Sequence, residues 1–336
     1  MLQESTKTSI IFGLSYFLAS SCYNFGMGKV EGFTVITAPE DRQIVPDVHE
    51  GVVHVQIPSE AVFRHPVRLQ WEFPACGEKT RLETEVGEKA KIVIVEELRG
   101  DRGQRAEHRE QWSHSVVIFL AEGAELEFIS VQATNPSIAC TLRQRSELQS
   151  HAMMQWRNVT VGSHVEQEIE SRLQGDDAMS AVDWIFYARG NEEQKLSARN
   201  VFLGKRGSGE MTMKGVAEEK AHVRCDGLIE IGEKGSGTDT YLTQEVLMLD
   251  ATAKVDAIPG LEIRTNDVKA SHSATISRVT EEDVFYFAAR GIAQREAKRM
   301  FVEGFLGEIV ERIADHAERE KILETVGQKY AVGSHF

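Results

Sequence analysis

The sequence of 336 residues lacks several features on which common kinds of ligand binding depend. Its 38 Lys and Arg residues are outnumbered by 52 Asp and Glu residues, and the formal net charge is −14. The surplus of basic side chains that attracts nucleic acids and anionic membranes is therefore missing, so we expect neither as a partner. With 41% hydrophobic residues, the chain can nevertheless bury a substantial core.

Cysteine is scarce as well. The four cysteines, Cys22, Cys76, Cys140 and Cys225, lie far apart and form no CxxC pair. This spacing encodes neither a zinc ribbon nor a dense disulfide framework. It favours reduced thiols and a cytoplasmic protein.

The common enzyme motifs are absent too. No GxGxxG, Walker A, HExxH or GxSxG string occurs in its required context. The glycine-rich segment 204–209, GKRGSG, resembles a phosphate-binding loop, but no GK[ST] string and helix follow it. We interpret it as a corner between two strands.

One apolar run stands near the N-terminus, at residues 9–22. It is too short to span a bilayer, and it follows Glu4 and Lys7 without a basic region before it. We expect a helix packed on the body of the protein, with an export or lipoprotein signal as the alternative.

From about residue 80 to residue 279, short runs rich in Val, Ile, Leu and Thr alternate with corners rich in Gly, Ala, Asp or Glu. Between Gly162 and Gly232 these corners recur every 13 to 15 residues or so, which is close to half a coil of a β-solenoid. An antiparallel sandwich or barrel is the competing fold, but it usually needs tight NG or DG turns. The only candidate, Asp226-Gly227, lies inside the alternating run 222–231.

After residue 279 the pattern becomes helical. Thr280 and Asp283 have the spacing of a capping box, and the helix that they begin should stop at Gly291. A second helix carries an apolar stripe that must cover another surface; its residues are Phe301, Phe305, Ile309 and Ile313. The sequence thus predicts three parts: an N-terminal irregular or helical region (1–79), a solenoid core (80–279) and a C-terminal helical domain (280–336).

Three residues are candidates for binding chemistry. Cys225 lies on an alternating strand and is either a buried inert thiol or a thiolate that binds iron or accepts sulfur. His272 is either a structural histidine or a neutral imidazole ligand. Glu245 is a carboxylate on an otherwise apolar strand, where burial requires a partner or a metal.

Around these residues the sequence resembles the SufB/SufD family, the scaffold proteins of the SUF iron-sulfur cluster assembly system. The resemblance is carried by HVRCDGLIEIGEKGSGTDTYLTQEV (222–246), DVKASHSATISRVTEEDVFYFAARGI (267–292) and EAKRMFVEGFL (296–306). It implies a mainly β fold, a right-handed parallel β-helix with a small C-terminal helical domain. It also implies a non-enzymatic scaffold whose C-terminal helices receive SufC, an ABC-type ATPase, so that ATP acts only through this partner.

The resemblance further implies that a transient iron-sulfur cluster forms where two scaffold subunits pair through their last coils. Cys225 takes the position of a cluster-assembly cysteine of SufB, and His272 that of an interface histidine of SufD. Ser273 departs from SufB, which typically has Glu after the histidine. We therefore expect a SufBD-type homodimer, or a heterodimer with a paralogous scaffold, in which Glu245 adds an oxygen ligand and a sulfur donor is a possible further partner.

Two other functions compete with this interpretation. A structural adaptor like SufD would dimerise with a true scaffold and activate the ATPase without binding a cluster, although such an adaptor needs no thiol at Cys225. A carbohydrate-active β-helix enzyme would need clustered Asp or Arg and Lys residues on one face and an export signal, neither of which is evident. The expected docking surface for the ATPase lies in the segment Phe287 to Lys298.

Overall fold

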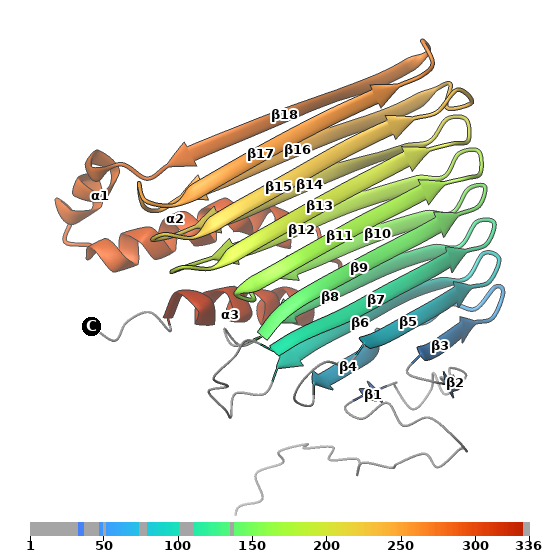
Figure 1. The fold of residues 1–336 in the computed structure, drawn as a ribbon, viewed down its shortest axis with the longest axis horizontal. Helices are drawn as coiled ribbons and strands as arrows, with labels where there is room; N and C mark the ends of the chain where they lie inside the picture. The colour runs from blue at the N-terminus through green and yellow to red at the C-terminus, as the bar shows by residue number, and fades with distance from the viewer. Residues whose placement is uncertain are drawn as a thin grey trace, which may run out of the picture.

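The computed structural model describes residues 33–36, 47–49, 52–73, 79–100, 110–134 and 138–331 (Figure 1). These residues form a mainly β protein, in which parallel strands are stacked as a β-solenoid and three helices follow. The solenoid fold expected from the corner spacing is confirmed. The apolar run 9–22, Cys22 and Cys76 lie outside the described residues.

The described residues contain eighteen strands. They are β1 (Phe33–Ile36), β2 (Asp47–His49), β3 (Val52–Ile57), β4 (Val67–Phe73), β5 (Lys79–Val86), β6 (Lys91–Gly100), β7 (Glu110–Leu120), β8 (Glu125–Ala133), β9 (Ile138–Leu148), β10 (Met153–Thr160), β11 (His164–Leu173), β12 (Met179–Ala188), β13 (Glu193–Phe202), β14 (Ser208–Ala217), β15 (His222–Ile231), β16 (Thr238–Met248), β17 (Lys254–Ile263) and β18 (Val268–Arg278).

Alternate strands belong to two facing sheets. Sheet A has the order β1-β4-β6-β8-β10-β12-β14-β16-β18, and sheet B has the order β17-β15-β13-β11-β9-β7-β5-β3-β2. In sheet B, His164 pairs with Glu193 and Glu193 pairs with His222, a step of 29 residues in both cases. One coil therefore holds two strands and two corners, which accounts for the corner spacing of about half that length.

The core lies between the sheets because every second side chain of each strand points inward. Strand β15 shows this alternation clearly, since Val223, Cys225 and Gly227 are buried while their neighbours are exposed or half-buried. Asp226-Gly227, the candidate for a tight turn in the competing antiparallel fold, lies inside this strand, as the alternating run indicated. The segment 204–209 joins β13 to β14 and is a corner, as expected.

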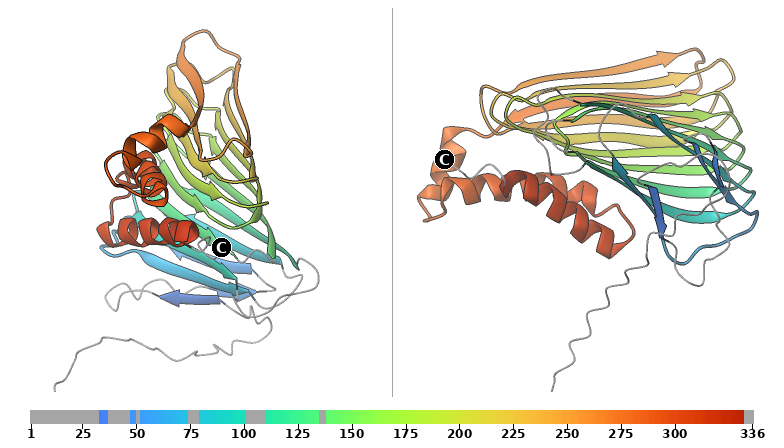
Figure 2. Two further views of the ribbon diagram at one scale, coloured as in Figure 1. Left: turned by 90° about the vertical axis from the view of Figure 1, so that its left-hand side faces the viewer. Right: turned by 60° about the horizontal axis from the view of Figure 1, so that its bottom comes forward.

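Three helices follow the solenoid: α1 (Glu281–Ala288), α2 (Gln294–Val310) and α3 (His316–Ala331). Thr280 and Asp283 form the predicted capping box at the start of α1. The chain then folds back so that α2 and α3 lie along the outer face of sheet A (Figure 2). The predicted stripe does pack on that face: Ile309 and Ile313 are buried there, and Phe301 and Phe305 are partly buried. Ile313 lies beyond the end of α2, however, and the helix also buries side chains that were not predicted, among them Val302 and Leu306.

The two ends of the solenoid differ. At the N-terminal end, β1 runs antiparallel to β4 and β2 runs antiparallel to β3, so both outermost strands there break the parallel order. Parallel pairing begins with β3 and β4, before residue 80. At the C-terminal end, β17 and β18 are the outermost strands, and no described residue pairs along their outer edges (Figure 1).

Candidate functional site

Cys225 lies inside the solenoid, one coil below its C-terminal end. Its side chain is fully buried, and in the strand ladder it is covered by Ala257 of β17. The thiol donates to the carbonyl oxygen of Asp256, with 3.6 Å between sulfur and oxygen. Burial raises the pKa of this thiol to about 12, and the negative charges of Asp226 and Asp256 add to the effect. In this closed arrangement the sulfur is protonated at neutral pH and out of reach of solvent.

His272 lies on the last coil and is exposed. It is on the same face of β18 as Val268 and Ala270, which pack against the core between the sheets. Its ladder neighbour on β16 is Leu242, which is fully buried. The imidazole therefore belongs to the inward face, and it is exposed because no described coil covers it.

Cys225 on sheet B and His272 on sheet A both face the interior between the two sheets, and both lie near its C-terminal end. Leu242, the neighbour of His272, lies against Gly227, where an added Cβ would be 2.8 Å from its methyl carbons. Gln244 Nε2 donates to the carbonyl oxygen of Cys225 at 3.0 Å. The two candidate ligands are thus separated by one coil and by the distance between the two sheets, and both belong to the C-terminal end of the solenoid interior.

Glu245 points the other way. Because Leu242, Gln244 and Val246 face inward, Glu245 lies on the outer face of sheet A. There its carboxylate is 2.9 Å from the ammonium of Lys214, which also lies 3.0 Å from Glu308 of α2. The structure places Glu245 under the helices and does not bring it to Cys225 and His272.

Lys214 was not anticipated from the sequence. Burial acts to lower the pKa of its ammonium, but hydrogen bonds and charge attraction from Glu245 and Glu308 outweigh burial and raise the pKa. The same ammonium lies 4.7 Å from the ring centre of Phe305. Lys214 and Glu245 are ladder neighbours on β14 and β16, so this pair could have been found only with knowledge of the register between the two strands.

Sequence reasoning also missed a buried polar cluster in the N-terminal coils. His114 Nε2 lies 2.9 Å from Glu96 Oε1, and His114 Nδ1 lies 2.8 Å from the hydroxyl of Thr80. Trp71 and Ser130 also donate to the Glu96 carboxylate. All of these groups satisfy one another, so the cluster supports the core there and offers no free ligand atom.

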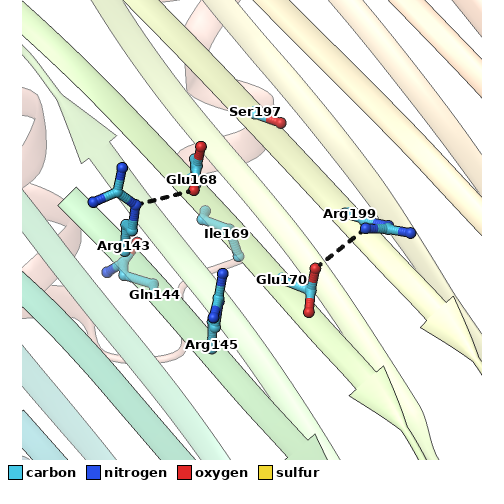
Figure 3. Close-up of a pocket in the computed structure, with 8 residues that line it drawn as sticks. All are labelled: Arg143, Gln144, Arg145, Glu168, Ile169, Glu170, Ser197 and Arg199. Atoms are coloured by element: carbon cyan, nitrogen blue, oxygen red, sulfur yellow. Dashed lines mark hydrogen bonds and ion pairs between the residues drawn. The ribbon is translucent and has the colours of Figure 1, made fainter. Parts of the chain in front are cut away.

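A groove of about 260 Å³ lies on the outer face of sheet B (Figure 3). It is lined by charged side chains from β9, β11 and β13, and Arg143 pairs with Glu168 at 3.4 Å while Arg199 pairs with Glu170 at 3.5 Å. It contains no cysteine or histidine, so it offers neither a thiolate nor an imidazole as a ligand for iron.

Within the described part of the chain, no group of three His, Cys, Asp or Glu side chains is arranged to hold a metal ion. At the C-terminal end of the solenoid, the candidate ligands of a single subunit are therefore the buried sulfur of Cys225 and the exposed imidazole of His272. The fold and these residues define a β-solenoid whose candidate ligands lie at its uncapped end.

Comparison with known proteins shows which family this solenoid belongs to. Residues 76–305, more than half of the chain, match the SufBD core domain of SUF-system iron-sulfur cluster assembly proteins. The chain belongs to the SufB/SufD family.

Curated relatives carry both paralogue names. The chain is 34% identical to the iron-sulfur cluster assembly protein SufD of Escherichia coli over 121 residues, which are 36% of this chain and 29% of that protein. It is 26% identical to SufB of Bacillus subtilis over 196 residues, 57% of this chain and 42% of that protein. A SufBD family protein of Mycobacterium leprae is 26% identical over 273 residues, 81% of this chain and 30% of that protein. The chain thus matches less than half the length of each of these relatives.

Among the described helices, none combines the length and the apolar character needed to cross a membrane.

Proposed function

We propose that this chain is a SufBD-type scaffold that assembles a transient iron-sulfur cluster at a subunit interface, together with a SufC-like ABC ATPase. The observation that supports this proposal is the position of Cys225 and His272 at the same uncapped end of the solenoid. A thiolate and an imidazole are suitable ligands for iron, and a second subunit would supply the ligands that one chain lacks. We propose a cytoplasmic location for this work, without nucleic acid or membrane partners.

The burial of Cys225 sets a requirement for this function. Its thiol must lose a proton and gain access to iron or to a sulfur donor, and both changes require Ala257 and the rest of the last coil to move. We propose that ATP binding by the partner supplies that movement through the C-terminal helices. Glu245 can join the ligand set only if the same movement separates it from Lys214.

The surface that we propose for the ATPase begins at α1. No residue of this helix is buried, and Phe285 and Tyr286 are 72% and 55% exposed. The guanidinium of Arg290 stacks on the ring of Tyr286, 3.6 Å from its centre. Exposed aromatic and arginine side chains of this kind are common anchors of protein interfaces.

The terminal coil is the proposed contact between subunits. Besides the open edges of β17 and β18, it exposes Ile263 and Ile276, which are 42% and 48% accessible. Uncovered strand edges with apolar side chains favour pairing with another chain. We propose a homodimer, with a heterodimer containing a paralogous scaffold as the alternative.

Anaerobic reconstitution with ferrous iron and sulfide tests the proposed site. Wild type is expected to develop the visible absorption of an iron-sulfur cluster, and Cys225→Ala and His272→Ala are expected to lose most of it. Cys140→Ala is a matched control because Cys140 is also a buried thiol inside the solenoid. Equal cluster uptake by wild type and Cys225→Ala would falsify the assignment.

A second candidate function is favoured by one observation, the closed state of Cys225. A SufD-like adaptor that dimerises and activates the ATPase without a cluster would keep such a thiol buried and protonated. Stimulation of the ATPase by a chain that takes up no cluster under any nucleotide condition would support this function.

A further inference from the structure

Gln244 lies on the inner face of β16 and reaches across the solenoid interior to β15. Its side chain is fully buried, and its Nε2 donates to the carbonyl oxygen of Cys225 at 3.0 Å. This close approach depends on Gly227, where an added Cβ would lie 3.1 Å from the same nitrogen. The amide of Gln244 therefore binds the backbone of the candidate ligand itself.

The carbonyl group that Gln244 binds belongs to the seam between β15 and its covering strand, β17. At the end of this seam, the N–H of Arg264 donates to the carbonyl oxygen of Ile231. Successive carbonyl groups of a strand point to opposite edges, so that of Cys225, six residues before Ile231, also points toward β17. Gln244 thus holds the seam at the place where β17 covers the Cys225 thiol.

Gln244 is held by its nitrogen alone. That nitrogen also lies 3.6 Å from the sulfur of Met213, which is a weak acceptor. The Oε1 atom is buried, and within the described part of the chain no donor reaches it. A buried carbonyl oxygen without a donor costs free energy, and it regains a donor when water enters. The closed arrangement therefore depends on the position of the Gln244 nitrogen.

The next residue of the same strand is tied to the helices. Glu245 points to the outer face of β16, opposite to Gln244. Its carboxylate lies 2.9 Å from the ammonium of Lys214, which lies 3.0 Å from Glu308 of α2. Two adjacent residues of β16 therefore bind the helices on one face and the seam over Cys225 on the other.

Other ion pairs join the helices to different parts of the solenoid. Lys298 of α2 lies 3.0 Å from Asp250, in the corner that follows β16. Lys329 of α3 pairs with Glu192, in the corner before β13. The first pair holds β16 just beyond its end, whereas the second attaches a helix without touching β16 and so provides a comparison.

We infer that Gln244 is a positioning residue for Cys225, and that β16 transmits to it the position of the C-terminal helices. Lys214 fixes the outer face of the strand, and Gln244 then keeps the seam closed over the thiol. Packed interiors compress little, so a displacement of β16 moves both of its faces together. This inference rests on the proposed function, in which Cys225 must become accessible.

Labelling of Cys225 with iodoacetamide in the whole folded chain tests the positioning role. Gln244→Met nearly preserves the side-chain volume but removes the donor, and it should accelerate labelling about tenfold. Gln167→Met is a matched control, because Gln167 is also buried inside the solenoid and donates to Gln144. The control should label like wild type. Equal acceleration by both variants would mean a general loosening of the core and would overturn the inference.

Substitutions on the outer face test the transmission. Lys214→Met should accelerate labelling of Cys225 severalfold, and Lys214→Arg, which keeps a cation for both carboxylates, should restore the wild-type rate. Lys329→Met removes a helix attachment that does not involve β16, so it should leave the rate unchanged. The inference fails if Lys214→Met labels like wild type or if Lys329→Met accelerates labelling as much.

A double variant shows whether the two residues act through one path. Lys214→Met combined with Gln244→Met should label no faster than Gln244→Met alone, because the hydrogen bond through which Lys214 acts is already gone. Accelerations that multiply would mean two independent effects and would defeat the proposed transmission.

The S–H stretching band of Cys225 gives a second readout, in a variant that retains Cys225 as its one cysteine. The thiol donates to the carbonyl oxygen of Asp256, so the position of the band reports on this contact. Gln244→Met should move the band toward that of a free thiol, and Gln167→Met should leave it in place. An unmoved band in Gln244→Met argues against a positioning role.

Cluster reconstitution separates this inference from the proposed function. A chain that needs Cys225 for cluster uptake, but whose labelling does not respond to Gln244→Met, defeats the inference alone. A chain in which labelling responds as expected, and in which Cys225→Ala takes up as much cluster as wild type, supports the inference and defeats the proposed function.

Discussion

The ammonium of Lys214 on β14 lies 3.0 Å from the carboxylate of Glu308 on α2. Through the second partner of the lysine, Glu245 on β16, this contact joins the C-terminal helices to the strand that pairs with β18. The attachment of the helices to the solenoid therefore combines apolar packing with ion pairs that lie partly out of water.

Replacing Lys214 with Met should loosen this attachment. The change keeps most of the aliphatic packing but leaves Glu245 and Glu308 without their shared cation. We expect the free energy of unfolding to fall by about 1 to 2 kcal/mol; the loss is limited because the Glu308 side chain is largely exposed to water. Urea unfolding measures this fall, and hydrogen exchange in the variant should become faster in α2 while that in β11 changes less. Lys254→Met, at an exposed position on β17, is the control and should change neither quantity.

Cys225 should be almost inert to alkylation in the folded protein. With its pKa raised to about 12, its thiolate fraction is small at pH 8 and grows about tenfold for each pH unit up to that value. Peptide-resolved labelling with iodoacetamide should therefore be at least a hundredfold slower at Cys225 in native protein than in urea. Fast labelling of native Cys225 at pH 8 would contradict the closed arrangement of the last coil.

The start of α1 should depend on pH. Hydrogen bonds from the backbone and side chain of Thr280 hold the pKa of the Asp283 carboxyl below its usual value. A lowered carboxyl pKa stabilises the fold above the unfolded value of about 4, and this contribution is lost as the pH falls through the folded value. Protection of the α1 amides, taken relative to their intrinsic exchange rate at each pH, should fall below pH 4 in wild type. Thr280→Ala should lower this protection already at pH 7, at a cost of about 1 kcal/mol of helix stability.

Loss of the exposed aromatic side chains of α1 should weaken ATPase binding and leave the fold unchanged. Phe285→Ala and Tyr286→Ala remove surface that is 72% and 55% exposed, so their unfolding free energies should stay within about 0.5 kcal/mol of wild type. Affinity for a SufC-like ATPase, measured by calorimetry, should fall at least tenfold. Leu323→Ala on α3, which is 42% exposed, is a matched control that should retain full affinity.

Much of the fold follows from local patterns. The alternation in residues 222–231 grouped Cys225 with Val223 and Gly227 on one face of a strand, and the structure agrees, because side-chain direction in a strand depends only on position parity. The structure shows that this face is the buried one. The capping box at Thr280 was also local, and it occurs as predicted. Position parity also puts Glu245 on the opposite face of its strand from Leu242, Gln244 and Val246. Nothing in this short stretch showed which of the two faces points into the solenoid, so the outward position of Glu245 was not predicted.

The sequence by itself determined the approximate period of the solenoid, the strand face that Cys225 shares with Val223 and Gly227, and the switch to helices, because each depends on residues that are neighbours along the chain. Only the tertiary structure decided that the helices return to cover sheet A, that Lys214 binds Glu245, and that the face of β15 with Cys225 is the inner one. Those relationships depend on the register between strands about 30 residues apart and on contacts of α2 nearly 100 residues from their partners. Register and long-range packing are set by the fit of whole surfaces, which no short stretch of sequence encodes.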